Sequence, residues 1–251
     1  MGGAIEIEDV HKAFNGQVVL DGLNVNFEED GITTVLGPSG TGKSVLLKHI
    51  VALLYPDRGD IRVFGRSVPQ MKEDELFSMR ESFGVLFQDG ALFGSMDVYA
   101  NIAFPLRKHT KLPEDEIRAI AMQRLGEVGL EGAEHKMPSE ISGGMRKRAG
   151  FARALVLNPR IVLFDEPDSG LDPVRVSLLN DLILDVHRQH GGTYVVVTHN
   201  VETARRISDH VGLLWQGKMV HYAPRDEAFS SSDPFVRQFL AGDSAGPLGM
   251  D

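Results

Sequence analysis

The feature that most constrains the fold is the segment Gly-Pro-Ser-Gly-Thr-Gly-Lys-Ser at 37–44, which matches G-x-x-x-x-G-K-[ST] in full. A short apolar, β-branched run at 32–36 precedes it, and apolar residues recur at helical spacing from Leu46 to Leu54. A strand, a glycine-rich loop and a helix in this order are what a phosphate-binding loop requires. The sequence therefore predicts an α/β fold that binds a nucleotide at this loop.

Each part of this loop has an expected role in binding a nucleotide. Its backbone N–H groups can surround phosphate oxygens. The Lys43 ammonium can reach the β- and γ-phosphates, and the Ser44 hydroxyl can ligate Mg²⁺. ATP and Mg²⁺ are therefore the expected ligands. The predicted ATP-binding residues of the loop and the following helix are Gly37, Pro38, Ser39, Gly40, Thr41, Gly42, Lys43, Ser44 and Val45.

A second candidate phosphate site is Ser142-Gly143-Gly144-Met145, at the start of a helix predicted to end before Asn158-Pro159. A serine hydroxyl and unobstructed backbone N–H groups at a helix start can bind phosphate oxygens. One chain rarely needs two phosphate sites for one nucleotide. We therefore expect two copies of the chain to share each ATP, with one site on either side of it. A simple helix N-cap at Ser142 is the alternative.

Two predicted strands end in polar side chains. The runs 161–164 and 194–197 are continuously apolar, as in parallel strands buried on both faces. Asp165 and Glu166 follow the first run, and His199 lies just beyond the second. Ligands of α/β sheets bind at the carboxyl ends of strands, so Asp165 is expected to face a metal. Glu166 is expected to orient or deprotonate an attacking water, the alternative being an ordinary acidic turn.

Composition excludes several classes of partner. The formal net charge of −9 over 251 residues argues against a nucleic-acid surface and against electrostatic docking on an anionic membrane. The absence of cysteine agrees with a reducing compartment. The sequence has no signal-peptide pattern and no apolar run near the roughly 20 residues that span a bilayer. We expect no nucleic-acid partner and no direct membrane insertion, so that any membrane attachment depends on another subunit.

The expected organisation is a single domain over 1–251. Its core is predicted at about 1–88 and 158–225, with a helical subdomain at about 89–157 and a tail at about 226–251. Pro113 and three following acids predict a helix start, and Gly129 predicts its end. In the tail, an apolar stripe and then several glycines predict a short helix and an extended arm that packs on another chain.

These motifs resemble ABC-type ATPases over nearly the whole chain. The resemblance implies a P-loop NTPase cassette with a mostly parallel core sheet, an antiparallel β part and an inserted helical subdomain. It identifies Gln88 as the Q-loop glutamine, which touches metal or water and senses a membrane partner. It identifies 169–172 as the D-loop, which crosses the dimer seam and brings Asp172 to the other subunit's ATP. The resemblance also implies that His199 contacts the γ-phosphate and that the Phe14 ring stacks on adenine. A core position is the alternative for Phe14.

The signature at 142–145 departs from the commonest ABC pattern, which has glutamine where this chain has Met145. The change removes a polar contact but keeps the serine and both glycines. The basic run 146–148 fits a solvated helix face as well as a phosphate contact. The expected catalytic residues are Glu166, His199, Gln88 and Lys43, the metal ligands are Ser44, Gln88 and Asp165, and the residues that bind ATP in trans are Ser142, Gly143, Gly144, Met145 and Asp172.

Strings at 86–93, 104–110, 138–145 and 236–240 look like the ATPases of Mla and mammalian-cell-entry (Mce) lipid transporters, and those at 165–175 and 143–150 look closest to the Mce branch. This resemblance implies an ATPase at the cytoplasmic face of the cell membrane that powers lipid or sterol transport. Its partners would be a second copy of itself, integral permease subunits and Mce-type proteins. Coupling to the permease would run through the Q-loop region, where several apolar residues are expected to dock it.

Two alternatives stay open. One is the ATPase of another ABC transporter with a hydrophilic substrate. The other is a non-transport ABC ATPase acting on nucleic acid or ribosomes, a class that usually has tandem cassettes or long coiled-coil insertions. The single cassette and the acidic balance of this chain disfavour the second alternative.

Overall fold

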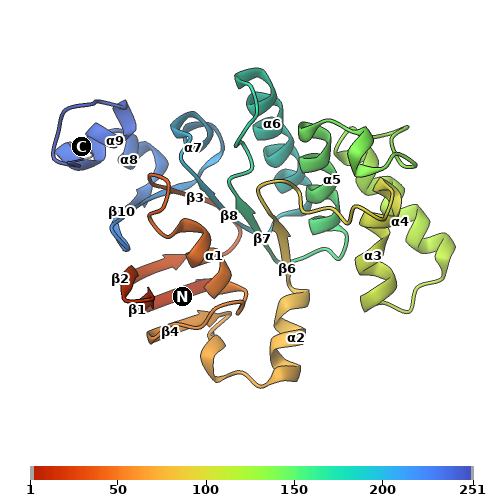
Figure 1. The fold of residues 1–251 in the computed structure, drawn as a ribbon, viewed down its shortest axis with the longest axis horizontal. Helices are drawn as coiled ribbons and strands as arrows, with labels where there is room; N and C mark the ends of the chain where they lie inside the picture. The colour runs from red at the N-terminus through yellow and green to blue at the C-terminus, as the bar shows by residue number, and fades with distance from the viewer. Residues whose placement is uncertain (1–2, 250–251) are drawn as a thin grey trace. The chain divides into compact units, whose positions relative to one another are not determined.

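The computed structural model describes residues 3–249. The chain divides into two compact units. The first combines both ends of the chain, Met1–Pro69 and Val197–Asp251, and the second is the middle, Gln70–Val196. In Figure 1 the first unit has the red, orange and blue segments, and the second runs from yellow to teal.

An antiparallel sheet in the first unit has the strand order β2-β1-β4-β5. Strand β1 pairs with β2 on one side and with β4 on the other, so that Ile5 lies opposite both Phe27 and Val63. All three of these side chains are buried, which gives this sheet one apolar face. The strands are β1 (Ile5–Phe14), β2 (Gln17–Phe27), β4 (Arg58–Val63) and β5 (Arg66–Ser67), followed by a 3₁₀ turn at Val68–Gln70.

The nucleotide loop of the first unit is supported by β3 (Ile32–Leu36), β9 (His210–Trp215) and β10 (Lys218–Pro224). β3 pairs in parallel with β9, and β9 pairs antiparallel with β10. Every residue of β3 is buried, as its continuous apolar pattern predicts. The accompanying helices are α1 (Lys43–Ile50), α7 (Val201–Ile207) and α8 (Arg225–Phe229).

The tail differs from its sequence-based prediction. Helix α9 (Pro234–Ala241) packs on its own unit, where Phe235, Phe239 and Leu240 contact a buried cluster that includes Leu213. The rings of Phe235 and Trp215 lie 5.8 Å apart. The prediction that the tail leaves the cassette is therefore wrong for α9, because its apolar stripe packs on a surface of the same unit. Contact of the tail with another chain stays a prediction.

The end of the tail is also folded back. Gly242 adopts a left-handed conformation and ends α9, which lets the chain reverse. The buried Gln238 amide donates to Asp243 O at 3.2 Å and accepts from Leu248 N at 2.8 Å. Leu248 is itself buried. One glutamine therefore closes the segment 243–248 onto the helix.

The second unit contains the strand that ends in the acidic pair and most of the strand that precedes the histidine. β6 (Phe83–Leu86) pairs in parallel with β7 (Ile161–Asp165), and β8 (Thr193–Thr198) is next to β7 in the strand order. The rings of Phe151, Phe164 and Tyr194 form a buried aromatic cluster, in which the Phe164 centroid lies 5.1 Å from that of Phe151 and 5.6 Å from that of Tyr194. These pairings are those of the mostly parallel core sheet that the sequence predicts.

Helices make up most of the second unit (Figure 1). α4 begins after Pro113 with three acids in its first turn, and α5 begins after Ser142, both as predicted. Asp97 caps α3 by accepting from Ala100 N at 2.7 Å. The helices are α2 (Glu73–Glu81), α3 (Val98–His109), α4 (Glu114–Glu127), α5 (Gly143–Leu155) and α6 (Pro173–His190), with a 3₁₀ turn at Pro138–Glu140.

Among residues 3–249, none of the helices combines the length and apolar character that crossing a membrane requires.

We expect Gln238→Ala to release the tail from α9. The substitution leaves the buried Leu248 N–H without its acceptor, which costs about 1–3 kcal/mol. Hydrogen exchange should show the Leu248 amide exchanging roughly tenfold faster or more. Arg237→Ala, on the neighbouring exposed residue, is the control and should leave that amide slow. Equal exchange rates in wild type and Gln238→Ala would contradict the closure.

Candidate functional site

The nucleotide loop lies between β3 and α1 and is closed on its own lysine. The Lys43 Nζ donates to Gly37 O at 2.6 Å and to Pro38 O at 2.9 Å, and the side chain is buried. The Thr41 hydroxyl also donates to Pro38 O, at 2.9 Å. An ammonium has three N–H donors but no acceptor, so Lys43 is suited to exchange a loop carbonyl for a phosphate oxygen.

Close backbone approach fixes the start of the loop. A Cβ on Gly37 would lie 2.4 Å from Leu214 O of strand β9, a distance that real Cβ atoms essentially never show. Any side chain at 37 would therefore push the loop away from the sheet. This glycine keeps the first turn of the loop tight against β9, where its backbone is positioned for a ligand.

His49, in the second turn of α1, is a supporting residue that the sequence did not indicate. It is fully buried, and its Nδ1 lies 2.7 Å from Val45 O. Burial lowers the pKa of His49, which favours the neutral ring that donates Nδ1–H to that carbonyl. Val45, expected beside ATP, is thus held through its backbone by a neutral histidine.

Phe14 and His199 belong to the same unit as the loop. Phe14 ends β1 and is 39% exposed, so the alternative of a core phenylalanine does not hold. Lys12 Nζ lies 5.5 Å from the centroid of the Phe14 ring. His199 follows β8 directly and is exposed. Both side chains are at the surface, where a ligand can reach them, and their contacts with adenine and γ-phosphate stay predictions.

The acidic pair sits at the end of β7 in the second unit. Asp165 is the last residue of the strand, and Glu166 follows it, both half-buried. Glu166 has φ 47°, a left-handed conformation that is uncommon for a residue with a side chain. Backbone strain of this kind costs about 1–3 kcal/mol and gathers at functional sites. The strained turn supports the role proposed for Glu166 over that of an ordinary acidic loop.

The Q-loop glutamine and the D-loop are joined directly. Gln88 Nε2 donates to Ser169 Oγ at 3.2 Å, a contact between residues 81 positions apart. At the end of the D-loop, Asp172 caps α6 by accepting from Val174 N and Arg175 N, each at 3.1 Å. Asp172 therefore has a structural role in its own chain, and its contact with a second chain's ATP stays a prediction.

Ser142 is the N-cap of α5. Its Oγ accepts from Met145 N at 3.3 Å, so the N-cap interpretation describes the chain as it stands. The hydroxyl hydrogen is a donor that this bond does not use. Ser142 and Gly143 are exposed, and Gly144 is half-buried. A capping serine at an exposed helix start can therefore also donate a hydrogen bond to a phosphate, as predicted for the trans site.

The basic run after the signature fits neither of its two interpretations. All three side chains donate to backbone carbonyls of their own unit. Arg146 donates to Ile141 O at 2.9 Å, and Arg148 donates to the carbonyls of 128 and 129 at 3.0 and 2.9 Å. Lys147 donates to two carbonyls of the segment after Glu166. The run is thus a set of internal anchors.

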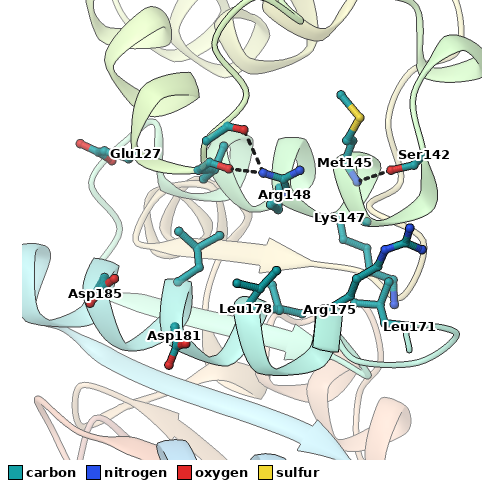
Figure 2. A pocket seen from close by; sticks show the side chains of 15 residues that line it. Glu127, Ser142, Met145, Lys147, Arg148, Leu171, Arg175, Leu178, Asp181 and Asp185 are labelled. Carbon is teal, nitrogen blue, oxygen red and sulfur yellow. Dashed lines mark hydrogen bonds between the residues drawn. The ribbon is translucent and has the colours of Figure 1, made fainter. Parts of the chain in front are cut away.

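A cavity of about 450 Å³ opens beside the signature serine. Figure 2 shows Ser142, Met145 and Arg148 along α5 on one side, and Leu178 and Asp181 of α6 on the other. Ligand pockets commonly have volumes of roughly 300–1,000 Å³. The space is therefore large enough for a ligand or a side chain of a second protein, next to the residues expected to act in trans.

The residues proposed for Mg²⁺ suit that ion chemically. Ser44, Gln88 and Asp165 offer hydroxyl, amide and carboxylate oxygens, the donors that Mg²⁺ prefers. Ser44 lies in the first unit, and Gln88 and Asp165 lie in the second. Over residues 3–249, no group of three or more His, Cys, Asp or Glu could hold a metal. Each of these oxygens is of the kind that binds Mg²⁺ together with nucleotide phosphates.

Comparison with known proteins decides the family. A model of the ABC transporter family matches residues 20–169. The chain belongs to the ABC transporter family. It is 52% identical over 250 residues to the "Probable ribonucleotide transport ATP-binding protein mkl" of Mycobacterium leprae, covering 100% of this chain and 72% of the relative. It is 39% identical over 244 residues to the "Intermembrane phospholipid transport system ATP-binding protein MlaF" of Escherichia coli K12, covering 97% and 91%.

A solved structure supports the same family. The ATP-binding cassette MJ0796, described as a dimer in a post-hydrolysis state bound to ADP and Pi, superposes with a TM-score of 0.80 at 28% identity. The match covers 88% of this chain and 98% of that one. The ABC cassette fold and the ABC transporter ATPase activity predicted from the sequence are confirmed. ABC cassettes bind ATP, dimerise and associate with permease subunits.

We expect Glu166→Gln to keep ATP binding and to slow hydrolysis by roughly 10²–10⁴, the usual contribution of a positioned general base. ATP binding and the rate of phosphate release should be measured on the same preparation, and size-exclusion chromatography should show an ATP-bound dimer. Glu131→Gln, at an exposed carboxylate of the same unit, is the control and should hydrolyse normally. A rate of ATP hydrolysis near that of wild type in Glu166→Gln would show that Glu166 is not the general base.

Proposed function

We propose that this chain is the ATPase subunit of an ABC transporter that moves lipid or sterol through an Mce-type membrane complex. The observation that carries the proposal is the 39% identity with MlaF over 97% of this chain, since that relative is named for intermembrane phospholipid transport. The strings at 86–93 and 104–110, which look like Mla and Mce ATPases, support it. The proposed place of work is the cytoplasmic face of the membrane, bound to a permease.

In the proposed cycle, two copies of one cassette domain sandwich ATP. The loop at 37–44 of one copy would hold the phosphates, and Ser142 with its two glycines would close the site from the other copy. Bound Mg²⁺, held by Ser44, Gln88 and Asp165, would offset the charge of the phosphates. Glu166 would orient or deprotonate the attacking water, and His199 would contact the γ-phosphate. The dimeric MJ0796 cassette with ADP and Pi supports the paired arrangement.

The proposed permease contact lies near the Q-loop. From the sequence, the residues expected to dock the partner are among Leu92, Phe93, Met96, Val98 and Tyr99. Phe93 is 43% exposed, and two further aromatic side chains, Phe87 and Phe104, are 37% and 36% exposed. The rings of Phe93 and Phe104 lie 5.0 Å apart and form one exposed apolar surface. Val98 is buried and packs internally instead. A partner helix needs anchors of the exposed kind.

A second candidate function is transport of a hydrophilic substrate. It is favoured by the 52% identity with a relative named for ribonucleotide transport. Both functions use the same ATP site, because the transported molecule would be selected by the membrane subunits. The substrate therefore has to be tested on the assembled transporter.

We expect the complete transporter, reconstituted in vesicles, to move a labelled phospholipid or sterol when ATP is supplied. The complex assembled with Glu166→Gln is the matched control, and it should bind ATP and move no lipid. A labelled ribonucleotide should neither stimulate ATP hydrolysis nor cross the membrane. ATP-dependent ribonucleotide transport without lipid transport would contradict the proposed function and favour the second candidate.

A further inference from the structure

Lys147 is a buried lysine on the second turn of α5, 5% exposed. Its Nζ donates to Pro167 O at 2.9 Å and also to Ser169 O. Burial lowers the pKa of Lys147, and the negative charge of nearby Asp168 opposes that shift. A buried cation is expensive unless hydrogen bonds satisfy it. The two carbonyls are therefore specific partners, and the solvated helix face expected for this run is excluded here.

These carbonyls belong to the turn that carries the chemistry. Ser169 N donates to Glu166 O at 3.2 Å, and Leu171 N donates to Asp168 O at 3.2 Å, so the chain from 166 to 171 forms two successive turns. Lys147 is bonded inside these turns. Its ammonium is therefore hydrogen-bonded to the segment that links the Glu166 backbone to the D-loop. Figure 2 shows Lys147 on the side of α5 that faces Leu171.

The same serine also bonds the Q-loop. The Ser169 carbonyl accepts from Lys147, and the Ser169 hydroxyl accepts from Gln88 Nε2 at 3.2 Å. Gln88 is exposed. Two side chains that start on different elements therefore hold one residue of the D-loop from two directions. A displacement of either is transmitted to the other through Ser169.

Helix α5 holds the Q-loop turn as well. Arg153 Nη1 and Nη2 donate to Ala91 O at 2.9 Å and to Gly90 O at 3.0 Å. A Cβ on Gly150 would lie 2.7 Å from Gly90 O, so the turn packs on the bare backbone of the helix. The helix that starts with the signature serine therefore anchors the Q-loop turn at its far end and the D-loop at its near end.

We propose that Lys147 is a positioning residue for ATP hydrolysis, which fixes the D-loop and the Glu166 turn to the signature helix. The ammonium makes α5, the D-loop and Gln88 move as one body. When Ser142 is drawn toward a phosphate, the shift reaches Glu166 through Lys147. The inference rests on the proposed assignment of Ser142 and Glu166 to the ATP site.

Lys147→Met tests this role, because it keeps the length and apolar stem of the side chain and removes only the donor group. The full chain should lose roughly 10- to 100-fold in kcat for ATP hydrolysis, the effect of a small misplacement of reacting groups. Its Kd for ATP, set by the loop at 37–44, should change by less than about twofold. Lys147→Arg restores a cation with several donors and should recover part of kcat.

Arg148→Met is the matched control. Arg148 is the next residue on α5, is half-buried and also donates to two backbone carbonyls, those of Val128 and Gly129. Its loss should lower stability like that of Lys147 and leave kcat within about twofold of wild type, since it has no bond to the D-loop. If Lys147→Met does not give folded protein, Lys147→Leu, which also removes the donor group, replaces it in the same comparison.

Two results would overturn the inference. One is an unchanged kcat in Lys147→Met. The other is an equal loss of kcat in the Lys147 and Arg148 variants, with no recovery in Lys147→Arg, which would mark a purely structural residue. Failure of the proposed ATP site is distinguishable, because Glu166→Gln would then hydrolyse ATP normally whatever the Lys147 variants do.

Discussion

The turns of this chain contain buried backbone carbonyls that need hydrogen-bond donors, and long basic side chains supply them. Lys43 closes the nucleotide loop through Gly37 and Pro38, and Lys147 holds Pro167 and Ser169. An unpaired buried carbonyl costs about as much as a lost hydrogen bond. The turns that carry the chemistry therefore keep their shape only while these cations stay in place. These hydrogen bonds are therefore needed to form the site, even without a bound nucleotide.

This arrangement explains why a chain with a formal net charge of −9 can still handle a polyphosphate. Its key cations are not spread over a basic surface, where they would attract nucleic acid. Lys43 and Lys147 are both buried and bonded to the main chain. One of them is placed to exchange a carbonyl for a phosphate oxygen. The other stays with the protein and, in our proposal, holds the D-loop and the Glu166 turn to the signature helix.

Local patterns predicted much of the fold. The apolar run before the loop is β3, the two continuous runs are β7 and β8, and the capping signals at Pro113 and Ser142 mark α4 and α5. The family, and with it the ATPase activity, followed from the spacing of short motifs. Helix α6 was not predicted, although Asp172-Pro173 is a start signal and apolar residues follow it at helical spacing.

What the sequence could not show were the partners of side chains. Lys147 meets carbonyls 20 and 22 residues away, and Arg153 meets Gly90 and Ala91 more than 60 residues back. Nothing in a basic run indicates which turns it will reach. The tail shows the same limit, because its apolar stripe was evident but the surface that covers it was not. Phe239 packs on its own unit, against the cluster that includes Leu213.

The central claim is that each ATP is shared by the loop of one copy and the signature of another. The most direct measurement mixes Ser142→Arg chains with Lys43→Ala chains, each without ATPase activity alone, and follows ATP hydrolysis. In a mixed dimer, one composite site combines the intact loop of the first variant with the intact signature of the second. The account predicts that activity appears on mixing. A mixture as inactive as its components, although mixed dimers are shown to form, would contradict it.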